Sequence, residues 1–236
     1  MNIHGKPSTI SALSLLTGCF PSNHSRSTPT NVMKGQAIRL LLEHLGVEYK
    51  ERLYDQRDAS VWFETDKHAL SLEFPNVNGD FKLTEYCAIL RYIAEKYDTV
   101  GKTLQERAKV SMLESAASEL RFDIRVAMSA HMKDEREKFL KRVPIILKQW
   151  SSFLGEKPFL LGDSPLYVDF MLYEDLDVLL YLERTILDET ENLVLYKKRI
   201  EELPAIKAYM NSERFIKWPL HFPYAAFGGG DAPAVQ

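Results

Sequence analysis

Histidines and cysteines are the first residues to test for chemistry, because they ligate metals and act as nucleophiles or bases. The six histidines are scattered, with no HExxH motif and no i, i+4 pair that could hold zinc. Cys19 and Cys87 stand 68 residues apart, so no CxxC motif exists. The sequence therefore predicts structural or solvated histidines and no metal site.

Glycine motifs for nucleotides and serine motifs for hydrolysis are also absent. Gly101-Lys102-Thr103 has the ending of a P-loop, but Lys96 stands where the first glycine of that loop is required. A run of three glycines at 228–230 has no helix pattern after it, which excludes a dinucleotide fingerprint. No GxSxG motif occurs. These patterns argue against nucleotide binding and against a serine nucleophile.

Composition excludes further classes. The chain has 236 residues, of which 45% are hydrophobic and 27% charged, as in ordinary globular proteins. Its 30 basic and 33 acidic residues give a net charge of −3, so we expect no nucleic-acid partner. The apolar runs are far too short for a membrane span, so we expect no membrane either.

Residues 1–34 differ from the rest. The first acidic residue of the chain is Glu43, and ten of the first thirty residues are Ser or Thr. A flexible N-terminal segment is the simplest interpretation. The alternative is an organellar transit peptide, which has this acid-poor, hydroxyl-rich composition.

Residues 35–97 are predicted to form a small mixed domain. Residues 36–45 have apolar side chains at helical spacing, and residues 47–54 alternate as a short strand does. An Asn-Gly turn signal follows at 78–79, and a helix opens at Thr84.

The pattern breaks at residues 98–103, and residues 104–236 are predicted to form an all-helical domain. The most apolar stretch should be its central core helix. The expected helices cover 103–132, 133–154, 168–187 and, as one helix or a broken pair, 193–210.

Five stretches carry a family resemblance through their order and spacing. They are AIRLLLE (37–43), LSLEFPN (70–76), AILRYIA (88–94), FLGEKPFLLGDSPLYVDF (153–170) and AYMNSERF (208–215). Together they resemble the cytosolic glutathione transferases, and the mu class most closely. The resemblance implies an α+β/α fold: a thioredoxin-like N-terminal domain, here with an incomplete sheet, followed by an all-α C-terminal domain. It also implies a homodimer in the cytoplasm, with glutathione as co-substrate and no cofactor.

The resemblance implies anchors for the glycine and cysteine parts of glutathione. Trp62 matches an indole donor near the glycine end, and Lys67 matches a lysine that pairs with the glycine carboxylate. Asn76 and Val77 match positions whose backbone grips the cysteinyl portion. Plain structural roles stay open as well, with Trp62 as packing and Lys67 as a solvated charge.

The resemblance also places residues at the γ-glutamyl end and at the hydrophobic substrate. Glu85 matches a residue that binds the γ-glutamyl end, and Glu119 matches an acid that reaches the amine from the other subunit. An ordinary first-turn acid and a solvated charge are the respective alternatives. The electrophile is expected near Phe122, Ser129 and Phe215.

Three departures from the family pattern fall on the glutathione site. Thr28 stands where the family has its thiol-activating tyrosine, so the catalytic residue is unknown. Thr28 or Ser27 could supply a substitute hydroxyl, and the alternative is that neither lies near the sulfur. Asn78 replaces a cis-proline, and a non-proline cis bond costs about 2.5–4 kcal/mol. Tyr86 replaces a serine that would support the γ-glutamyl carboxylate. The sheet is therefore expected to lack its first strand and part of another.

The leading hypothesis is a glutathione transferase that conjugates reduced glutathione to hydrophobic electrophiles. The alternative is a catalytically impaired ligand-binding or structural protein on the same fold, which the departures favour. A glutathione-dependent isomerase is a third possibility that no residue selects.

Overall fold

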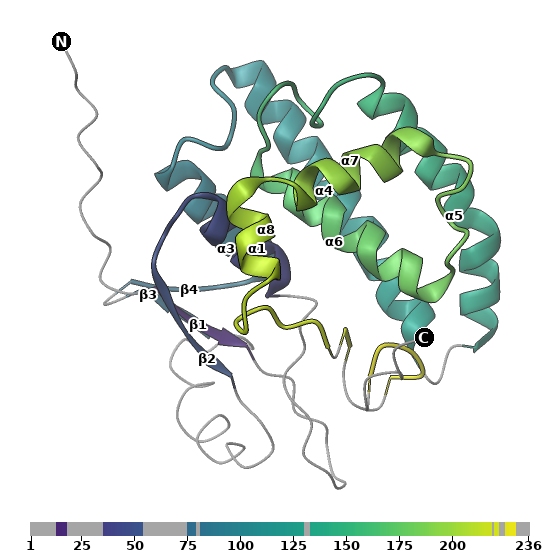
Figure 1. Cartoon of the computed structure of the whole chain (residues 1–236), viewed down its shortest axis with the longest axis horizontal. Helices are drawn as coiled ribbons and strands as arrows, with labels where there is room; N and C mark the ends of the chain where they lie inside the picture. The colour runs from purple at the N-terminus through teal and green to yellow at the C-terminus, as the bar shows by residue number, and fades with distance from the viewer. Residues whose placement is uncertain are drawn as a thin grey trace, which may run out of the picture.

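A mixed four-stranded sheet forms the first layer of the protein (Figure 1). The computed structural model describes residues 13–17, 35–53, 75–78, 81–129, 133–218, 220–221 and 225–229. The strands are β1 (Leu13–Thr17), β2 (Tyr49–Leu53), β3 (Pro75–Asn78) and β4 (Phe81–Thr84). Their order in the sheet is β2-β1-β3-β4, with β1 parallel to β2 and both other pairs antiparallel.

The central strand β1 differs from the sequence expectation. It lies within residues 1–34, which we expected to lie outside the sheet, and it pairs along its whole length with β2. The sheet therefore has its first strand. A strand of five residues in a segment rich in hydroxyl side chains has too few alternating positions to be separated from a loop by pattern. The domain boundaries at 34, 97 and 104 stay predictions.

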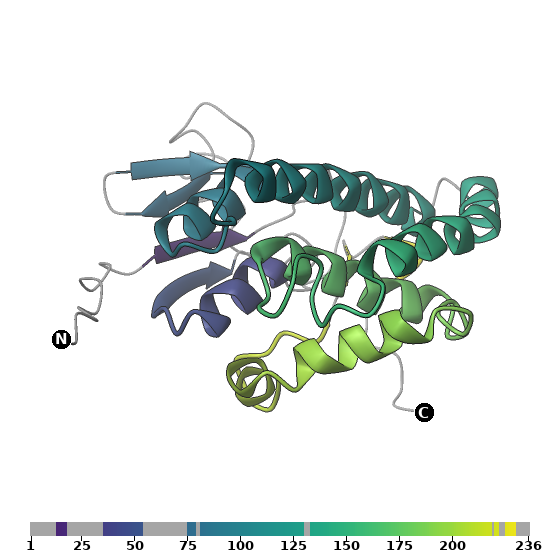
Figure 2. The same ribbon diagram turned by 90° about the horizontal axis from the view of Figure 1, so that it is seen from above.

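Two helices connect the sheet to the rest of the chain. Helix α1 (Gln36–His44) provides the crossover that a parallel β1–β2 pair requires, and its side chains from Gln36 to Leu42 are buried. Helix α3 (Tyr86–Lys96) follows β4 directly. Helix α1 packs against α3, α6 and α8, so it joins the sheet layer to the helical layer (Figure 2).

The rest of the described chain is helical, as the sequence predicts. The helices are α4 (Leu104–Met128), α5 (Lys133–Leu154), α6 (Tyr167–Leu182), α7 (Glu191–Glu201) and α8 (Pro204–Met210). Thr103 caps α4 through a capping box with Glu106. The expected helix over 193–210 is a broken pair because Pro204 cannot continue α7 and instead begins α8.

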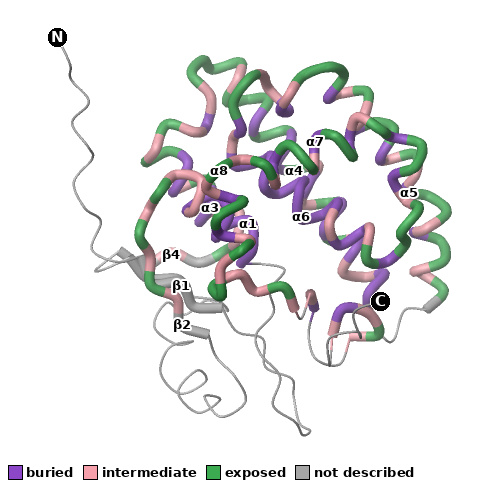
Figure 3. The backbone as a smooth tube through the Cα atoms, in the orientation of Figure 1, coloured by how far each residue is buried: buried purple, intermediate pink, exposed green. Residues whose placement is uncertain are grey.

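Helix α6 is the central core helix, as predicted. Every residue from Tyr167 to Leu176 is buried, and Figure 3 shows the burial running along most of the helix. It packs against α1, α3, α4 and α7, so both layers of the protein meet on it. A helix buried on all sides must pair its polar groups with other protein groups.

Asp169 satisfies the backbone at the beginning of α6. Its carboxylate accepts hydrogen bonds from the backbone N–H of Leu160 (2.9 Å) and Leu166 (2.8 Å) and from the hydroxyl of Tyr196 (3.0 Å). The side chain is fully buried, and this burial raises its pKa to about 6 against the effect of these hydrogen bonds. Asp169 thus links the start of α6 to the preceding loop and to α7.

Two adjacent carboxylates lie in the middle of α6 with one cation from α4 against them. Arg121 Nη1 donates to Glu174 Oε2 (2.9 Å), and Arg121 Nη2 lies 2.9 Å from Asp175 Oδ1. Burial raises the pKa of Glu174 and of Asp175 to about 7, although Arg121 acts in the opposite direction. The folded pair therefore binds protons more tightly than the same carboxyls in an unfolded chain, and Arg121 pairs with them when they are ionised.

The tail returns to the end of α4. Ala226 N–H donates to the carbonyl of Met128 (3.0 Å), and His221 N–H donates to the carbonyl of Gly228 (2.8 Å). Gly228 has φ of 74°, and a Cβ there would lie 2.5 Å from Met128 Cε. The positive φ favours glycine at this position, and the described part of the tail packs on the end of α4.

Asp169→Ala should destabilise the protein by about 2–4 kcal/mol, because it leaves the backbone N–H groups of Leu160 and Leu166 without their acceptor and removes one of the two acceptors of the Tyr196 hydroxyl. Chemical denaturation followed by far-UV circular dichroism measures this. Asp163→Ala, at an exposed position of the preceding loop, is the control and should change the free energy of unfolding by less than about 0.5 kcal/mol. Equal effects of the two substitutions would contradict the role of Asp169.

The buried carboxylate pair should make stability fall as pH rises from about 4 to about 7. Because the folded-state pKa values are raised, the folded protein binds more protons than the unfolded chain in this window, and the free energy of unfolding decreases with pH. Asp175→Asn removes the contribution of one carboxyl group to this pH dependence. Denaturation curves between about pH 5 and about pH 7.5 should fall less steeply in this variant than in the wild type. Parallel curves would show that Asp175 does not titrate differently in the two states.

Candidate functional site

The start of α1 is built around a buried cation. Arg39 Nε donates to both carboxylate oxygens of Glu51 on β2 (3.0 and 2.9 Å), and Arg39 Nη1 donates to Gln36 Oε1 (3.1 Å). Burial acts to lower the pKa of Arg39, but the hydrogen bonds and charge of Glu51 outweigh it and raise that pKa. Gly35 precedes the helix and packs against the guanidinium, where a Cβ would lie 3.0 Å from Nη2. The α1 start is therefore fixed to the sheet by charge.

The start of α3 combines an exposed acid with a buried ring. Glu85 has φ of 73° and ψ of 123°, a left-handed backbone that is uncommon for residues other than glycine. Its side chain is exposed, so it is open to a ligand. The ring of Tyr86 lies over the guanidinium of Arg121, with 4.9 Å between Cζ and the ring centroid. A strained residue at a helix start next to an open surface is typical of a binding site.

The hydroxyl of Tyr86 turns inward. It is buried and has no hydrogen-bond partner among the described residues, and burial raises its pKa well above the ordinary value. Tyr86 therefore offers no exposed hydroxyl at the start of α3 that could take the place of the family's serine.

Asn76 and Val77 lie on β3, next to the start of α3. Asn76 pairs with Leu83 and Val77 with Lys82 in the antiparallel β3–β4 ladder, and Val77 also pairs with Ser14 of β1. Strand β4 ends one residue before Glu85. Asn76 and Val77 thus lie on the first strand of the β3–β4 hairpin, and Glu85 lies where the second strand leads into α3. Trp62, Lys67, Ser27 and Thr28 lie outside the described residues.

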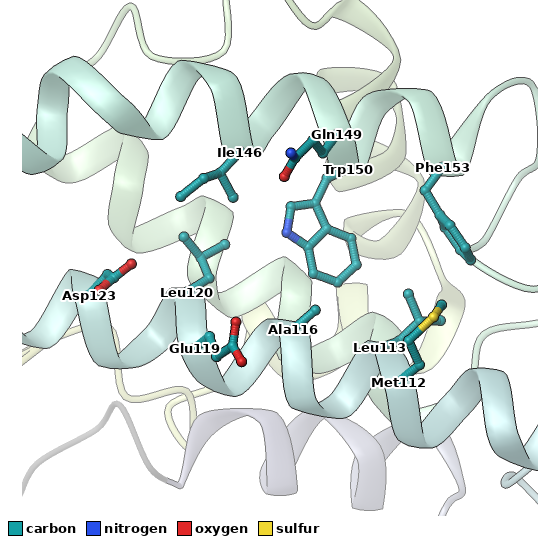
Figure 4. Close-up of a pocket in the computed structure, with 10 residues that line it drawn as sticks. All are labelled: Met112, Leu113, Ala116, Glu119, Leu120, Asp123, Ile146, Gln149, Trp150 and Phe153. Carbon is teal, nitrogen blue, oxygen red and sulfur yellow. The ribbon is translucent and has the colours of Figure 1, made fainter.

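Glu119 lines a separate feature, a groove of about 310 Å³ between α4 and α5 (Figure 4). The apolar lining is open to solvent, since the side chain of Met112 is 51% exposed. Glu119 and Asp123 place carboxylates on the α4 side. The lining comes from Met112, Leu113, Ala116, Glu119, Leu120, Asp123, Ile146, Gln149, Trp150 and Phe153.

The three residues expected near the electrophile do not line this groove. Phe122 is 57% exposed on α4, with Arg125 over its ring, and Ser129 ends the same helix. Phe215 packs edge-on against Tyr209 of α8, with 5.3 Å between the ring centroids. The pockets described in the structure do not join these three residues, so their common role stays a prediction.

The sequence analysis missed the ionic cluster of Arg121, Glu174 and Asp175. A signal was available in the sequence. Glu174 and Asp175 interrupt the most apolar stretch of the chain, and Arg121 lies on the buried side of α4, between Leu120 and Ile124. Charges are almost never fully buried unless they are paired. Charged residues inside a predicted core helix therefore indicate partners on a neighbouring helix.

Two absences hold for the described residues. They contain no group of three or more His, Cys, Asp or Glu side chains that could hold a metal ion. Nor do they contain a helix long and apolar enough to cross a membrane.

Family models and related proteins match both parts of the chain. A model of the glutathione S-transferase N-terminal domain matches residues 30–95, and one of the C-terminal domain matches residues 122–213. A class-mu 26 kDa isozyme 1 of glutathione S-transferase from Fasciola hepatica is 48% identical over 203 residues, which cover 84% of this chain and 91% of that protein. Glutathione S-transferase Mu 1 from Bos taurus is 40% identical over 202 residues, covering 81% and 92%.

A solved structure supports the fold. The pi-class glutathione S-transferase of Onchocerca volvulus superposes with a TM-score of 0.77 at 20% identity, covering 91% of this chain and 99% of that one. The thioredoxin-like sheet layer and the all-helical layer predicted from the resemblance are thereby confirmed. With family models on both halves and relatives at 40–48% identity along four-fifths of its length, the chain belongs to the glutathione S-transferase family and is similar to its mu class.

Proposed function

We propose that this chain transfers glutathione to hydrophobic electrophiles. The observation that carries the proposal is the 48% identity over 203 residues with a protein named a class-mu glutathione S-transferase. Glutathione enters as a co-substrate, and no resident cofactor is needed. The cytoplasm is the proposed location.

The reaction joins the glutathione sulfur to an electrophilic carbon. The thiol first releases its proton, because the thiolate is the nucleophile. The sulfur electron pair forms the new C–S bond, and a leaving group such as chloride departs with the electron pair of the broken bond. A hydrogen-bond donor near the sulfur favours the thiolate. Thr28 is the candidate hydroxyl for this donor, since the family's tyrosine is missing there.

The anchors for glutathione follow the sheet from β3 into α3. Asn76 and Val77 would hold the cysteinyl portion through their backbone, and Glu85 would meet the γ-glutamyl end. The pairing of Asn76 with Leu83, two residues before Glu85, supports this, because it keeps both subsites on one short hairpin. Trp62 and Lys67 would hold the glycine end.

Lys67→Ala should raise the KM for glutathione about 10- to 100-fold, because it removes a charge-assisted hydrogen bond to a carboxylate, worth about 1.5–3 kcal/mol. Steady-state conjugation to an activated aryl chloride measures this. Lys198→Ala, at an exposed position of α7, is the matched control and should keep the wild-type KM.

The same assay tests the function itself. Saturable conjugation by the wild type supports a transferase. Glutathione binding by calorimetry without turnover would instead support a ligand-binding protein. A fall in kcat at constant KM in Thr28→Ala would identify the hydroxyl donor, whereas full conjugation would exclude Thr28.

We also propose that the α4–α5 groove is covered by a second copy of the chain. The apolar lining of the groove is open to solvent, with the side chain of Met112 51% exposed, and such surfaces typically mark interfaces. Glu119 lies on the rim of the groove, and its proposed target is the glutathione amine in the other subunit. A homodimer would cover the exposed lining of the groove and would bring Glu119 to the other subunit.

Ala116→Glu should convert the homodimer to single chains, because it places a charge among the apolar residues of the groove. Size-exclusion chromatography with light scattering measures the mass. Val194→Glu, which adds the same charge at an exposed apolar position of α7, should keep the mass of two chains. A wild-type protein with the mass of one chain would overturn the proposal.

A further inference from the structure

One buried ion pair contacts the beginnings of two helices. The N–H of Ala37, in the first turn of α1, donates to Glu174 Oε2 (3.2 Å). Arg121 Nη1 donates to the same oxygen (2.9 Å). The guanidinium of Arg121 also lies under the ring of Tyr86, the first residue of α3. A single Glu–Arg pair therefore connects the starts of α1 and α3.

The pair itself is fixed in the helical layer. Glu174 belongs to α6 and Arg121 to α4, and both are buried. Arg121 Nη2 donates to the carbonyl of Met171 (3.2 Å) and lies 2.9 Å from Asp175 Oδ1. Separating opposite charges in a low-dielectric interior is unfavourable, so this arrangement resists displacement. The helical layer can thus hold the two helix starts in place.

The start of α3 is one of the places where glutathione is proposed to bind. Glu85 stands directly before Tyr86, and the other proposed anchors in the described chain, Asn76 and Val77, lie on β3. Subsites on separate elements must be held to within about 0.5 Å to bind one ligand well. Glu174 accepts a hydrogen bond from the start of α1, and Arg121 lies against Tyr86 at the start of α3. Together they set the distance between the two helix starts.

We infer that Glu174 and Arg121 are positioning residues that fix the starts of α1 and α3 relative to each other and thereby set the affinity for the γ-glutamyl end of glutathione. This inference rests on the proposed function. It assigns no contact between the pair and glutathione, because both side chains are buried beneath the helix starts.

Glu174→Gln tests the pair with a small change in shape, since the amide oxygen still accepts one hydrogen bond but carries no charge. In steady-state conjugation by the full chain, KM for glutathione should rise about tenfold, a change equal to about 1.4 kcal/mol, while kcat stays within about twofold. Asp177→Asn is the matched control, because Asp177 lies on the same helix and pairs with Lys197 (3.0 Å) across to α7. It should keep the wild-type KM.

Hydrogen exchange of the ligand-free chain separates this inference from the proposed function. Peptides that cover 35–44 and 85–96 should exchange faster in Glu174→Gln than in the wild type, while peptides from α7 should not change. If the wild type fails to bind glutathione, the proposed function fails, and the exchange data alone decide whether the pair holds the two helix starts. Unchanged exchange in both peptides, or faster exchange with an unchanged KM, overturns the inference.

A second variant covers the case in which Glu174→Gln does not fold. Arg121→Met combined with Glu174→Met and Asp175→Asn removes all three charges together, so none is left buried without a partner. This variant should fold and show the same raised KM. A folded triple variant with the wild-type KM would show that the pair only fills space.

Discussion

The burial of α6 on all sides is the constraint on which the rest of the structure depends. A helix in that position has no water for its polar groups, so each must find a protein partner. Asp169 takes donors from the preceding loop and α7, and Glu174 takes donors from α1 and α4. These carboxylates therefore join the layers. If the layers moved apart, the carboxylates would stay buried without partners, which is energetically unfavourable.

The helical layer is predictable from sequence because its signals are long. Helices α4 and α5 repeat an apolar stripe over many turns, and the break before Pro204 follows from proline chemistry. Strand β1 was not predictable, since five residues give little periodicity and its partners are distant in sequence. Its place between β2 and β3 depends on tertiary pairing, which local pattern does not contain.

The candidate site was predictable only where a family motif supplied it. The resemblance placed Asn76, Val77 and Glu85, and the β3–β4 hairpin brings these positions together. The contact next to Glu85 is made by Arg121 of α4 against Tyr86, and Glu174 of α6 in turn pairs with Arg121. Such pairs follow from packing between helices, so a motif search that looks for residues facing a ligand does not find them.

The position of β1 has a consequence for biosynthesis. Among the described strands this one is made first, yet its neighbours on either side, β2 and β3, are synthesised only after it, and β3 ends at Asn78. During synthesis, β1 must therefore remain unpaired until the ribosome has added the residues that form β2 and β3. The described strand that is translated earliest is thus among the last to gain both of its neighbours.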